Sequence, residues 1–332
     1  MGKKALITGG AGTIGYFLGK SLAEQGQEIT IADNLFRGKM DSEMKELLQM
    51  PNVKFLELDV TDFNQFIKLD SDYDYVYHLA AINGTKNFYE IPERVLKVGV
   101  LGVINILEWF KEQKKGKILF SSSNEGYASF INLTGGPIPT PETVPLCIDD
   151  VLNPRWSYAG SKIIGELLFI NYSRAFKFPM SIIRYHNSYG PRMGKEHVIP
   201  EFLMRVIKKE DPFKIFGAET SRSFCYITDS ILATQQVMES EKTNNEIVHI
   251  GNSKEEITIL NLAKKMFDLF NFHPQNLEIH DAPQGSVKRR CPDLTKIREL
   301  VDYQPLVSLD EGLKETYNWY KNYVAQGNQK EQ

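Results

Sequence analysis

The segment Thr8-Gly9-Gly10-Ala11-Gly12-Thr13-Ile14-Gly15 follows a short β-rich run directly and leads directly into a helical stretch. Its glycines at 9, 12 and 15 permit a tight turn, close approach of the backbone to a pyrophosphate, and close packing of a helix on a strand. The helix N-terminus adds free amides and the positive end of its dipole. A glycine triplet alone is a weak signal, but this strand–turn–helix context predicts a dinucleotide-binding site.

Outward from this turn, the first half of the chain alternates β-rich runs with helical stretches. Apolar repeats at helical spacing predict helices over 13–25, 92–111 and 157–176. Strands are expected at 4–8, 28–32, 53–58, 75–79, 117–121 and 180–185. Strands that alternate with helices predict an α/β fold, here a doubly wound Rossmann sheet of parallel strands.

After Tyr189-Gly190-Pro191 the elements become shorter and turn residues more frequent, with one helical segment at 198–209. We therefore expect residues 1–185 to form an NAD-binding Rossmann domain. Residues 186–325 are expected to form mainly a smaller C-terminal substrate lobe, interleaved with the sheet. Residues 326–332 are expected to be a frayed tail.

Composition limits the function classes. With 332 residues, of which 42% are apolar and 24% charged, the chain can bury a large core. Its net charge of -3 gives no general attraction to nucleic acid or to an anionic membrane. No apolar run reaches the length of a membrane span, and the N-terminus lacks a signal-peptide layout, so a cytoplasmic protein is expected. Three scattered cysteines and six scattered histidines predict no metal site.

The residues at the ends of the predicted strands indicate the cofactor. Asp33 lies at the end of the second strand, where its carboxylate would bond the adenosine ribose and repel the extra phosphate of NADP. Arg37 leaves NADP open as an alternative, because it can swing in to neutralise that phosphate. Residues 59–60 would flank the adenine, and residues 79–81 would line the pyrophosphate. The predicted NAD site comprises Gly9, Gly12, Thr13, Ile14, Gly15, Asp33, Asn34, Asp59, Val60, Leu79, Ala80 and Ala81.

The segment Trp156-Ser157-Tyr158-Ala159-Gly160-Ser161-Lys162 places a tyrosine and a lysine four residues apart, on one helical face. In isolation such a pair is more often a surface feature of a helix. Here it follows a strand that ends in residues 121–123, all serines, which offer hydroxyls to the same substrate oxygen. A nearby ammonium and an oxidised nicotinamide both favour the phenolate. We therefore predict that Tyr158 takes a hydroxyl proton, assisted by Lys162 and Ser123.

With these motifs, the chain resembles the extended short-chain dehydrogenases/reductases of the nucleotide-sugar epimerase/dehydratase family over nearly its whole length. The resemblance includes Arg184-x-x-Asn187-x-Tyr189-Gly190-Pro191-Arg192, Arg222-Ser-Phe224-Cys-Tyr226-Ile-x-Asp229 and Arg290-Cys-Pro292-Asp293. It implies an NAD-dependent enzyme that oxidises a nucleotide-linked sugar at C4. It also implies that Asn187, Arg222 and Arg290 hold the diphosphate or the sugar.

The segment Ser123-Asn124-Glu125-Gly126-Tyr127 bears on the later step. In the family, a glutamate here is typical of dehydratases and decarboxylases, so Glu125 is a candidate for guiding a C5 proton made acidic by a C4 ketone. Asn124 stands where dehydratases place an acid, and the segment around Arg290 resembles nucleotide-glucuronate decarboxylases. C5 chemistry, by decarboxylation or dehydration, is the prediction. A 4-epimerase and a catalytically idle NAD-sensing protein are the alternatives.

Two further features concern the periphery of the fold. The insertion at 129–150, rich in proline and glycine, is interpreted either as a lid over the sugar or as a surface loop. The helices at 92–111 and 157–176 carry apolar residues over wide faces, and such a helix needs cover on the side away from its own sheet. A homodimer through these two helices is expected.

Overall fold

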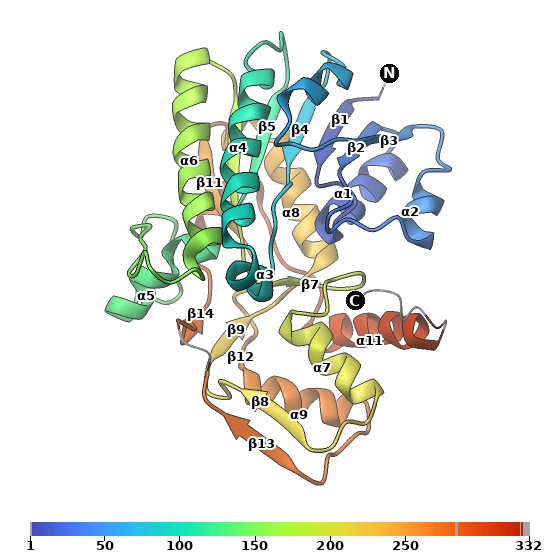
Figure 1. Ribbon diagram of the computed structural model, residues 1–332, viewed down its shortest axis with the longest axis vertical. Coiled ribbons are helices and arrows are strands. Elements are labelled where there is room, and N and C mark those ends of the chain that lie inside the picture. Colours follow the sequence, from blue (N-terminus) through green and yellow to red (C-terminus); the bar gives the residue numbers. More distant parts are fainter. Residues whose placement is uncertain (1, 283–284, 326, 328–332) are drawn as a thin grey trace.

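A computed structural model describes residues 2–282, 285–325 and 327 of the chain. Figure 1 shows a sheet with helices on both sides in the upper part of the view and a smaller lobe below it. The sheet contains seven parallel strands in the order β11-β6-β5-β4-β1-β2-β3. Their bounds are β1 Lys4–Thr8, β2 Glu28–Asp33, β3 Val53–Glu57, β4 Tyr75–His78, β5 Lys117–Ser123, β6 Met180–Tyr185 and β11 Glu246–Ile250.

Helices cover both faces of this sheet, because alternate residues of its strands point to opposite sides. Ile7 of β1 joins the apolar core beneath α1 and α8, whereas its neighbour Leu6 joins the core beneath α4 and α6. The helices concerned are α1 Thr13–Glu24, α8 Ile227–Glu239, α4 Pro92–Phe110 and α6 Trp156–Phe176. This arrangement confirms the predicted α/β doubly wound fold.

Strand order reverses between β1 and β4, which lie side by side at the centre of the sheet although β2 and β3 intervene in the sequence. In open α/β sheets the crevice at such a reversal, beyond the carboxyl ends of the strands, is where ligands bind. The glycine turn follows β1 and the segment beginning at Leu79 follows β4, so both predicted cofactor segments lie at this crevice.

One strand of the sheet was not expected from the sequence. This strand, β11, pairs with β6 and brings residues of the predicted lobe into the sheet. Strand β5 ends in the three serines at 121–123, as expected, although the range predicted for it stopped at residue 121. Strand β2 ends in Asp33, as expected. The proposed division at residue 185/186 remains a prediction, and the tail at 326–332, apart from Gly327, lies outside the described residues.

The smaller lobe has its own apolar core, built around Leu203, Phe213, Leu262 and Leu313. Its helices are α7 Val198–Ile207, α9 Ile259–Leu269 and α11 Leu309–Ala325. Its short strands are β8 Phe213–Phe216, β9 Ser221–Ser223, β12 Glu256–Thr258, β13 Leu277–His280 and β14 Arg289–Arg290. A further pair of short strands, β7 Ser188–Tyr189 and β10 Cys225–Tyr226, connects the lobe to the sheet. The predicted helix at 198–209 thus ends at Ile207.

The insertion at 129–150 is joined to the rest of the molecule by backbone hydrogen bonds. After the short helix α5, Ala128–Thr134, the Thr140 amide donates to the Cys291 carbonyl at 2.8 Å, and the Asp293 amide donates to the Thr140 carbonyl at 2.8 Å. Apolar residues of the insertion pack against Tyr127 and Trp156. The segment therefore supports the strand end that carries Arg290, and is more than a loop lying on the surface.

Over the described parts of the chain, every helix is too short or too polar to serve as a bilayer span. The predicted cytoplasmic location is a separate question and remains a prediction.

Candidate active site

The glycine turn is shaped by contacts that no side chain would allow. Gly9 has a φ of +69°, and a Cβ on it would lie 2.8 Å from the Ala80 backbone. A Cβ on Gly15 would lie 2.5 Å from the Gly9 carbonyl oxygen, far inside van der Waals contact. Gly12 caps the N-terminus of α1. The turn therefore exposes backbone amides at a helix N-terminus, which is an environment suited to a pyrophosphate.

Asp33 lies beside this turn at the end of β2. Its carboxylate accepts hydrogen bonds from the Ala11 amide at 3.0 Å and the Leu35 amide at 2.8 Å. Burial raises the pKa of Asp33, and the two amides act against that shift. A Cβ on Gly38 would lie 2.6 Å from Asp33 Oδ1, so the backbone passes close to this carboxylate. The Asp33 carboxylate is thus held in a fixed position, as an acceptor for ribose hydroxyls requires.

Arg37 is engaged elsewhere. Its guanidinium donates to the Asn83 carbonyl and pairs with Glu196, which lie on loops across the cleft. Because its guanidinium joins these two loops, Arg37 is not positioned to bind the extra phosphate of NADP, as the alternative would require.

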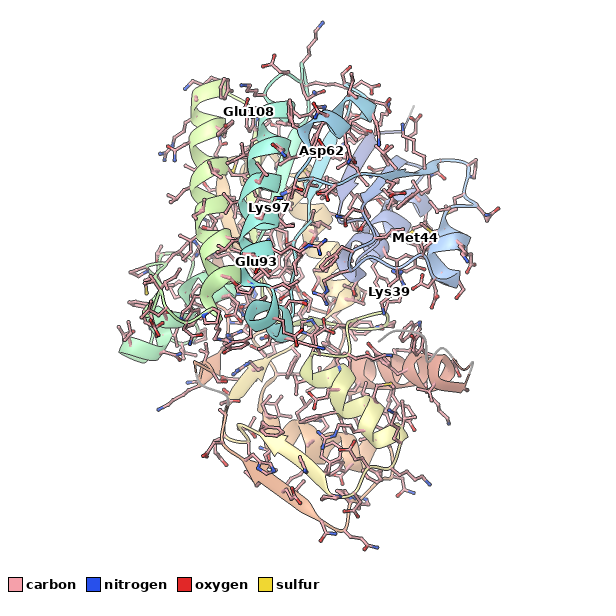
Figure 2. The ribbon with its side chains drawn as sticks, viewed as in Figure 1. Lys39, Met44, Asp62, Glu93, Lys97 and Glu108 are labelled. Carbon is pink, nitrogen blue, oxygen red and sulfur yellow. The ribbon has the colours of Figure 1, made fainter. Side chains whose placement is uncertain are left out.

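A cleft of about 590 Å³ runs along this edge of the sheet. It is lined by all the residues predicted for the NAD site: Gly9, Gly12, Thr13, Ile14, Gly15, Asp33, Asn34, Asp59, Val60, Leu79, Ala80 and Ala81. Figure 2 shows Glu93 and Lys97 along α4, and Lys39 below Met44, toward the smaller lobe. Glu93, Lys97 and Lys39 also line the cleft. Ser121, Tyr158 and Lys162 also line the cleft, so a dinucleotide lying in it would be within reach of these residues.

Tyr158 and Lys162 lie in the first turns of α6, with both side chains almost fully buried. Lys162 Nζ lies 5.4 Å from the centre of the Tyr158 ring and donates to the Ser121 carbonyl at 2.6 Å. Phe88 stacks on the Tyr158 ring, with ring centres 5.1 Å apart. Both side chains are therefore held rigidly by packing, on one face of the helix as predicted.

The buried setting changes the acidity of this pair. Burial lowers the pKa of Lys162 to about 7, and Glu166 acts in the opposite direction. Burial also raises the pKa of Tyr158, as does the charge of Glu125, while a hydrogen bond with Ser123 acts to lower that pKa. Forming the phenolate therefore requires added positive charge, which the Lys162 ammonium and an oxidised nicotinamide can provide.

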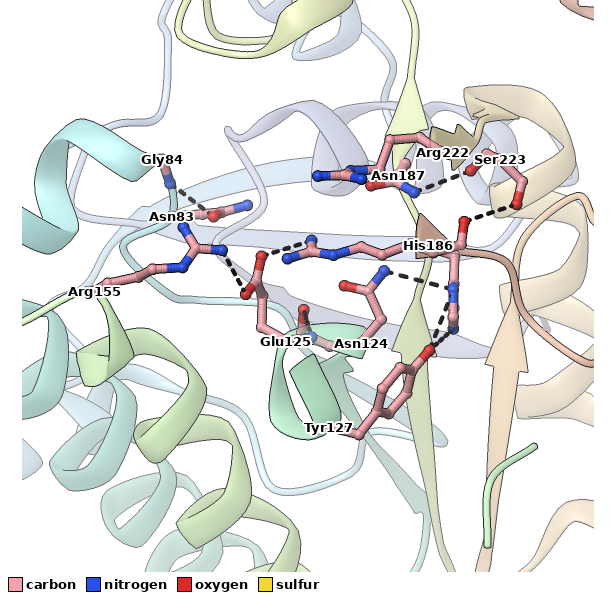
Figure 3. A network of polar contacts seen from close by, with 12 residues as sticks. Asn83, Gly84, Asn124, Glu125, Tyr127, Arg155, His186, Asn187, Arg222 and Ser223 are labelled. Carbon is pink, nitrogen blue, oxygen red and sulfur yellow. Dashed lines mark hydrogen bonds and ion pairs between the residues drawn. The ribbon is translucent and has the colours of Figure 1, made fainter. Parts of the chain in front are cut away.

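Glu125 lies in the turn after β5, between two arginines (Figure 3). Its carboxylate contacts Arg290 Nη1 at 2.7 Å and Arg155 Nη2 at 3.3 Å. Burial acts to raise the pKa of Glu125, but Arg290 and Arg155 outweigh that effect and hold the pKa below its ordinary value. The Ser123 hydroxyl accepts from the Glu125 amide at 3.2 Å and so fixes the turn. Glu125 is therefore a charged carboxylate next to Tyr158.

The residues predicted to hold the substrate come together from three segments. Arg222 and Arg290 are direct register partners on the parallel strands β9 and β14. Asn187 donates its side-chain amide to the Ser223 carbonyl at 3.0 Å, which ties it to the same strand (Figure 3). Burial and the charge of Arg290 lower the pKa of Arg222. These side chains form a positively charged patch next to Glu125.

Asn124 is turned away from this patch toward a buried histidine. Its side-chain nitrogen lies 3.5 Å from Nδ1 of His186, whose Nε2 lies 2.9 Å from the Tyr127 hydroxyl. Burial lowers the pKa of His186 to about 3, so the imidazole is neutral. Asn124 therefore provides a buried amide at this position and no acidic group.

Sequence reasoning missed Arg155. The signal that points to it is its position three residues before Tyr158, at the N-cap of α6. Residues three apart on a helix share a face, so an arginine there is brought to the same side as the tyrosine. As for metals, the described residues contain no group of three or more His, Cys, Asp or Glu side chains arranged to hold an ion.

Together, the doubly wound sheet, the glycine turn with Asp33, and the buried Tyr158–Lys162 pair define a dinucleotide-dependent enzyme of the short-chain dehydrogenase/reductase class. The chain belongs to the NAD dependent epimerase/dehydratase family, whose model matches residues 5–251. It is thus an NAD-dependent enzyme, as predicted, and the glycine turn and the held Asp33 carboxylate fit that cofactor.

Individual relatives cover almost the whole chain. A UDP-N-acetyl-alpha-D-glucosaminuronate decarboxylase of Bacillus cytotoxicus is 34% identical, over 97% of this chain and 98% of the relative. A UDP-glucuronate 4-epimerase of Thermodesulfobacterium geofontis is 31% identical, over 96% of each chain. The crystal structure of a UDP-glucose 4-epimerase of Thermotoga maritima superposes with a TM-score of 0.84 at 29% identity, covering 97% of this chain and 99% of that one.

Proposed function

We propose that this enzyme oxidises a UDP-linked hexuronate at C4 and then removes its C6 carboxylate as carbon dioxide. The observation that carries the proposal is the Glu125 carboxylate, held charged between Arg155 and Arg290 beside Tyr158, with a buried amide at Asn124 where dehydratases place an acid. The resemblance to a UDP-N-acetylglucosaminuronate decarboxylase supports the same reaction and the uridine nucleotide.

Each proposed catalytic residue has a role that its surroundings allow. Tyr158 takes the proton from the C4 hydroxyl, and Ser123 holds the same oxygen. The Lys162 ammonium stabilises the phenolate. The glycine turn and Asp33 would hold NAD, which would supply the hydride chemistry at C4. Asn187, Arg222 and Arg290 bind the diphosphate or the sugar, since guanidinium groups make paired hydrogen bonds with phosphate oxygens.

A C4 ketone makes the sugar a β-keto acid. The C5–C6 bond then breaks, carbon dioxide leaves, and the electron pair moves through C5 onto the C4 oxygen as an enolate. C5 takes up a proton from solvent before the ketone is reduced. Glu125 guides that proton and holds the two arginines against the sugar. Dehydration would instead need an acid for the leaving hydroxyl, and Asn124 cannot act as one.

Product masses test the proposal directly. The protein is incubated with NAD and a panel of UDP-sugars that includes UDP-glucuronate, UDP-N-acetylglucosaminuronate and their neutral hexose counterparts. We expect a product lighter by one carbon dioxide from a uronate. A product lighter by one water would favour dehydration, and a product of unchanged mass would favour epimerisation; either result would overturn the decarboxylase proposal.

A 4-epimerase is the second candidate, and the resemblance to a UDP-glucuronate 4-epimerase supports it. Such an enzyme needs no C5 proton chemistry, so Glu125 would then serve only to hold the arginines. Membership of an enzyme family argues against the alternative of a catalytically idle NAD sensor, as does the complete set of Tyr158, Lys162 and Ser123, for which a sensor has no use.

The proposed assembly is a homodimer through α4 and α6, which lie side by side in Figure 1. Leu96 on α4, and Ile164 and Leu167 on α6, are exposed apolar side chains on these helices. Pairing the two helices with their copies would cover these residues in a four-helix interface, as is common in the family. The proposed compartment is the cytoplasm, where NAD and nucleotide sugars are available.

A further inference from the structure

Three arginines, Arg155, Arg222 and Arg290, lie close enough to interact electrostatically with one another and with Glu125. Arg155 and Arg290 are both more than nine-tenths buried. Among the described residues, Glu125 is the acid in this cluster whose charge acts to raise the pKa of Arg222. One carboxylate cannot neutralise three guanidinium groups, and uncompensated buried charge is costly. The cluster is therefore suited to receive a further anionic group.

Two of these guanidinium groups have hydrogen-bonding capacity left. The Nε atoms of Arg155 and Arg290 are both buried and have no hydrogen-bond partner among the described residues. Arg155 makes one contact to Glu125, through Nη2 at 3.3 Å, which is long for a charge-assisted hydrogen bond. Arg155 thus retains donors for a second carboxylate.

A UDP-hexuronate carries two anionic parts, the diphosphate and the C6 carboxylate. The positions of the three arginines indicate which anionic part each of them would bind. Arg222 and Arg290 lie next to each other on β9 and β14, in the smaller lobe. Arg155 instead belongs to the start of α6, three residues from Tyr158. Tyr158 must contact the oxygen on C4, and C5, which bears the carboxylate, is the adjacent ring carbon. Arg155 therefore lies at the sugar end of the site.

We propose that Arg155 binds the C6 carboxylate of the substrate and sets the preference for uronates over neutral hexoses. This inference rests on the proposed function. The planar guanidinium suits a carboxylate because it offers two parallel N–H donors. The Trp156 ring lies 5.2 Å from the guanidinium and restricts where it can move. Glu125 accepts a hydrogen bond from one nitrogen of the Arg155 guanidinium, Nη2, and so keeps the guanidinium in position.

The test measures binding in a Tyr158→Phe background, so that turnover does not change the ligand. The probes are UDP-glucuronate, UDP-glucose and UDP, by calorimetric titration of the NAD-loaded protein. UDP-glucuronate and UDP-glucose differ only at C6, and UDP lacks the sugar. We expect the background protein to prefer UDP-glucuronate. Adding Arg155→Gln should weaken UDP-glucuronate binding about 30-fold or more, as expected for the loss of a buried charged hydrogen bond, and change the other two less than about threefold.

Two further variants make the test specific. Arg174→Gln removes an exposed arginine near the other end of the same helix, and should leave all three affinities unchanged. Arg155→Lys keeps the charge but not the paired donors, and should recover part of the uronate preference. If Arg155→Gln fails to bind NAD and is therefore misfolded, Arg155→Lys still tests the role of the same side chain.

Equal weakening of all three probes by Arg155→Gln would assign Arg155 to the diphosphate and overturn the inference. Unchanged uronate affinity, or a background protein without uronate preference, would overturn it as well. The proposed function fails separately: a wild-type enzyme that prefers uronates but releases no carbon dioxide would contradict decarboxylation and leave the role of Arg155 standing.

Discussion

At the scale of single residues, the site consists of buried charges that are each held by a specific neighbour. Lys162 is bonded to the Ser121 carbonyl, and Glu125 is held between two arginines. Buried groups that are fixed in this way need little reorganisation during a reaction, and their charges act in a medium of low dielectric. Substitutions at these positions should therefore affect chemistry more than binding.

Tyr158→Phe removes the proton acceptor while it keeps the ring that stacks on Phe88. We expect turnover to fall about 10³-fold, within the range for loss of a general base, while UDP-sugar affinity changes by less than about threefold. Steady-state kinetics and calorimetric titration measure the two effects. Tyr172→Phe, on the same helix but bonded to Glu108, is the matched control. Retention of most activity in Tyr158→Phe would mean that another group takes the proton.

Glu125→Gln separates the two chemical steps. If Glu125 guides C5 chemistry, the first oxidation proceeds and the later step is slowed, so that the near-ultraviolet absorbance of reduced nicotinamide builds up during a single turnover. The substitution also leaves Arg155 and Arg290 without their acid, so we expect some loss of stability, on the order of 1–3 kcal/mol. Stopped-flow absorbance together with a denaturant titration measures both. Unchanged turnover without trapped reduced cofactor would favour the epimerase alternative.

At the scale of elements, a buried lysine joins the sheet to a helix end. Lys117, at the start of β5, donates to the carbonyls of Val237 and Ser240 at 2.9 and 2.8 Å and to the Thr243 hydroxyl at 2.9 Å. The last carbonyls of a helix lack partners within the helix, so Lys117 serves the C-terminal end of α8. These hydrogen bonds fix α8 against the sheet, next to β11. Strand β11 was not predicted from the sequence.

Lys117→Met should lower the free energy of unfolding by about 1–3 kcal/mol at pH 7, because buried carbonyls lose their donor. Burial lowers the pKa of Lys117 from 10.5 to about 8. Between these two values the unfolded state binds more protons, so the contribution of Lys117 to stability rises with pH. The difference between wild type and variant should therefore be larger at pH 10 than at pH 7.

Denaturant titrations at the two pH values measure this difference. Lys115→Met is the matched control, because Lys115 is exposed and paired with Asp74 at the surface; its effect should stay below about 1 kcal/mol. A stability difference for Lys117→Met that shrinks as the pH rises would contradict the burial of a charged amine at this position.

At the scale of the whole molecule, the candidate active site lies where the sheet and the smaller lobe meet. The sheet provides the cofactor cleft, helix α6 provides Tyr158 and Lys162, and the smaller lobe provides Arg222 and Arg290. The insertion at 129–150 connects the two through the hydrogen bonds of Thr140. A change in the relative position of sheet and lobe would therefore alter the distance between the proton acceptor and the arginines.

The proposed dimer can be broken at its centre. Replacing Ile164 and Leu167 together with aspartate puts charge on the exposed apolar face of α6, where burial in a dimer would be strongly unfavourable. Light scattering at micromolar concentration should then show a monomer, whereas we expect the wild-type protein to be a dimer. Leu306→Asp, an exposed leucine of the smaller lobe, is the control and should remain dimeric. A monomeric wild-type protein would refute the dimer.

The sequence by itself determined the doubly wound fold, the glycine turn and the Tyr158–Lys162 pair. Each depends on residues that are close together in the chain, and local spacing fixes which face of a strand or helix they share. Only the tertiary structure decided that β11 completes the sheet and that Arg155, Glu125 and Arg290 meet. Arg155 is 30 residues from Glu125, and Arg290 is on a strand of another lobe. Such contacts arise from the packing of whole elements, which no local pattern encodes.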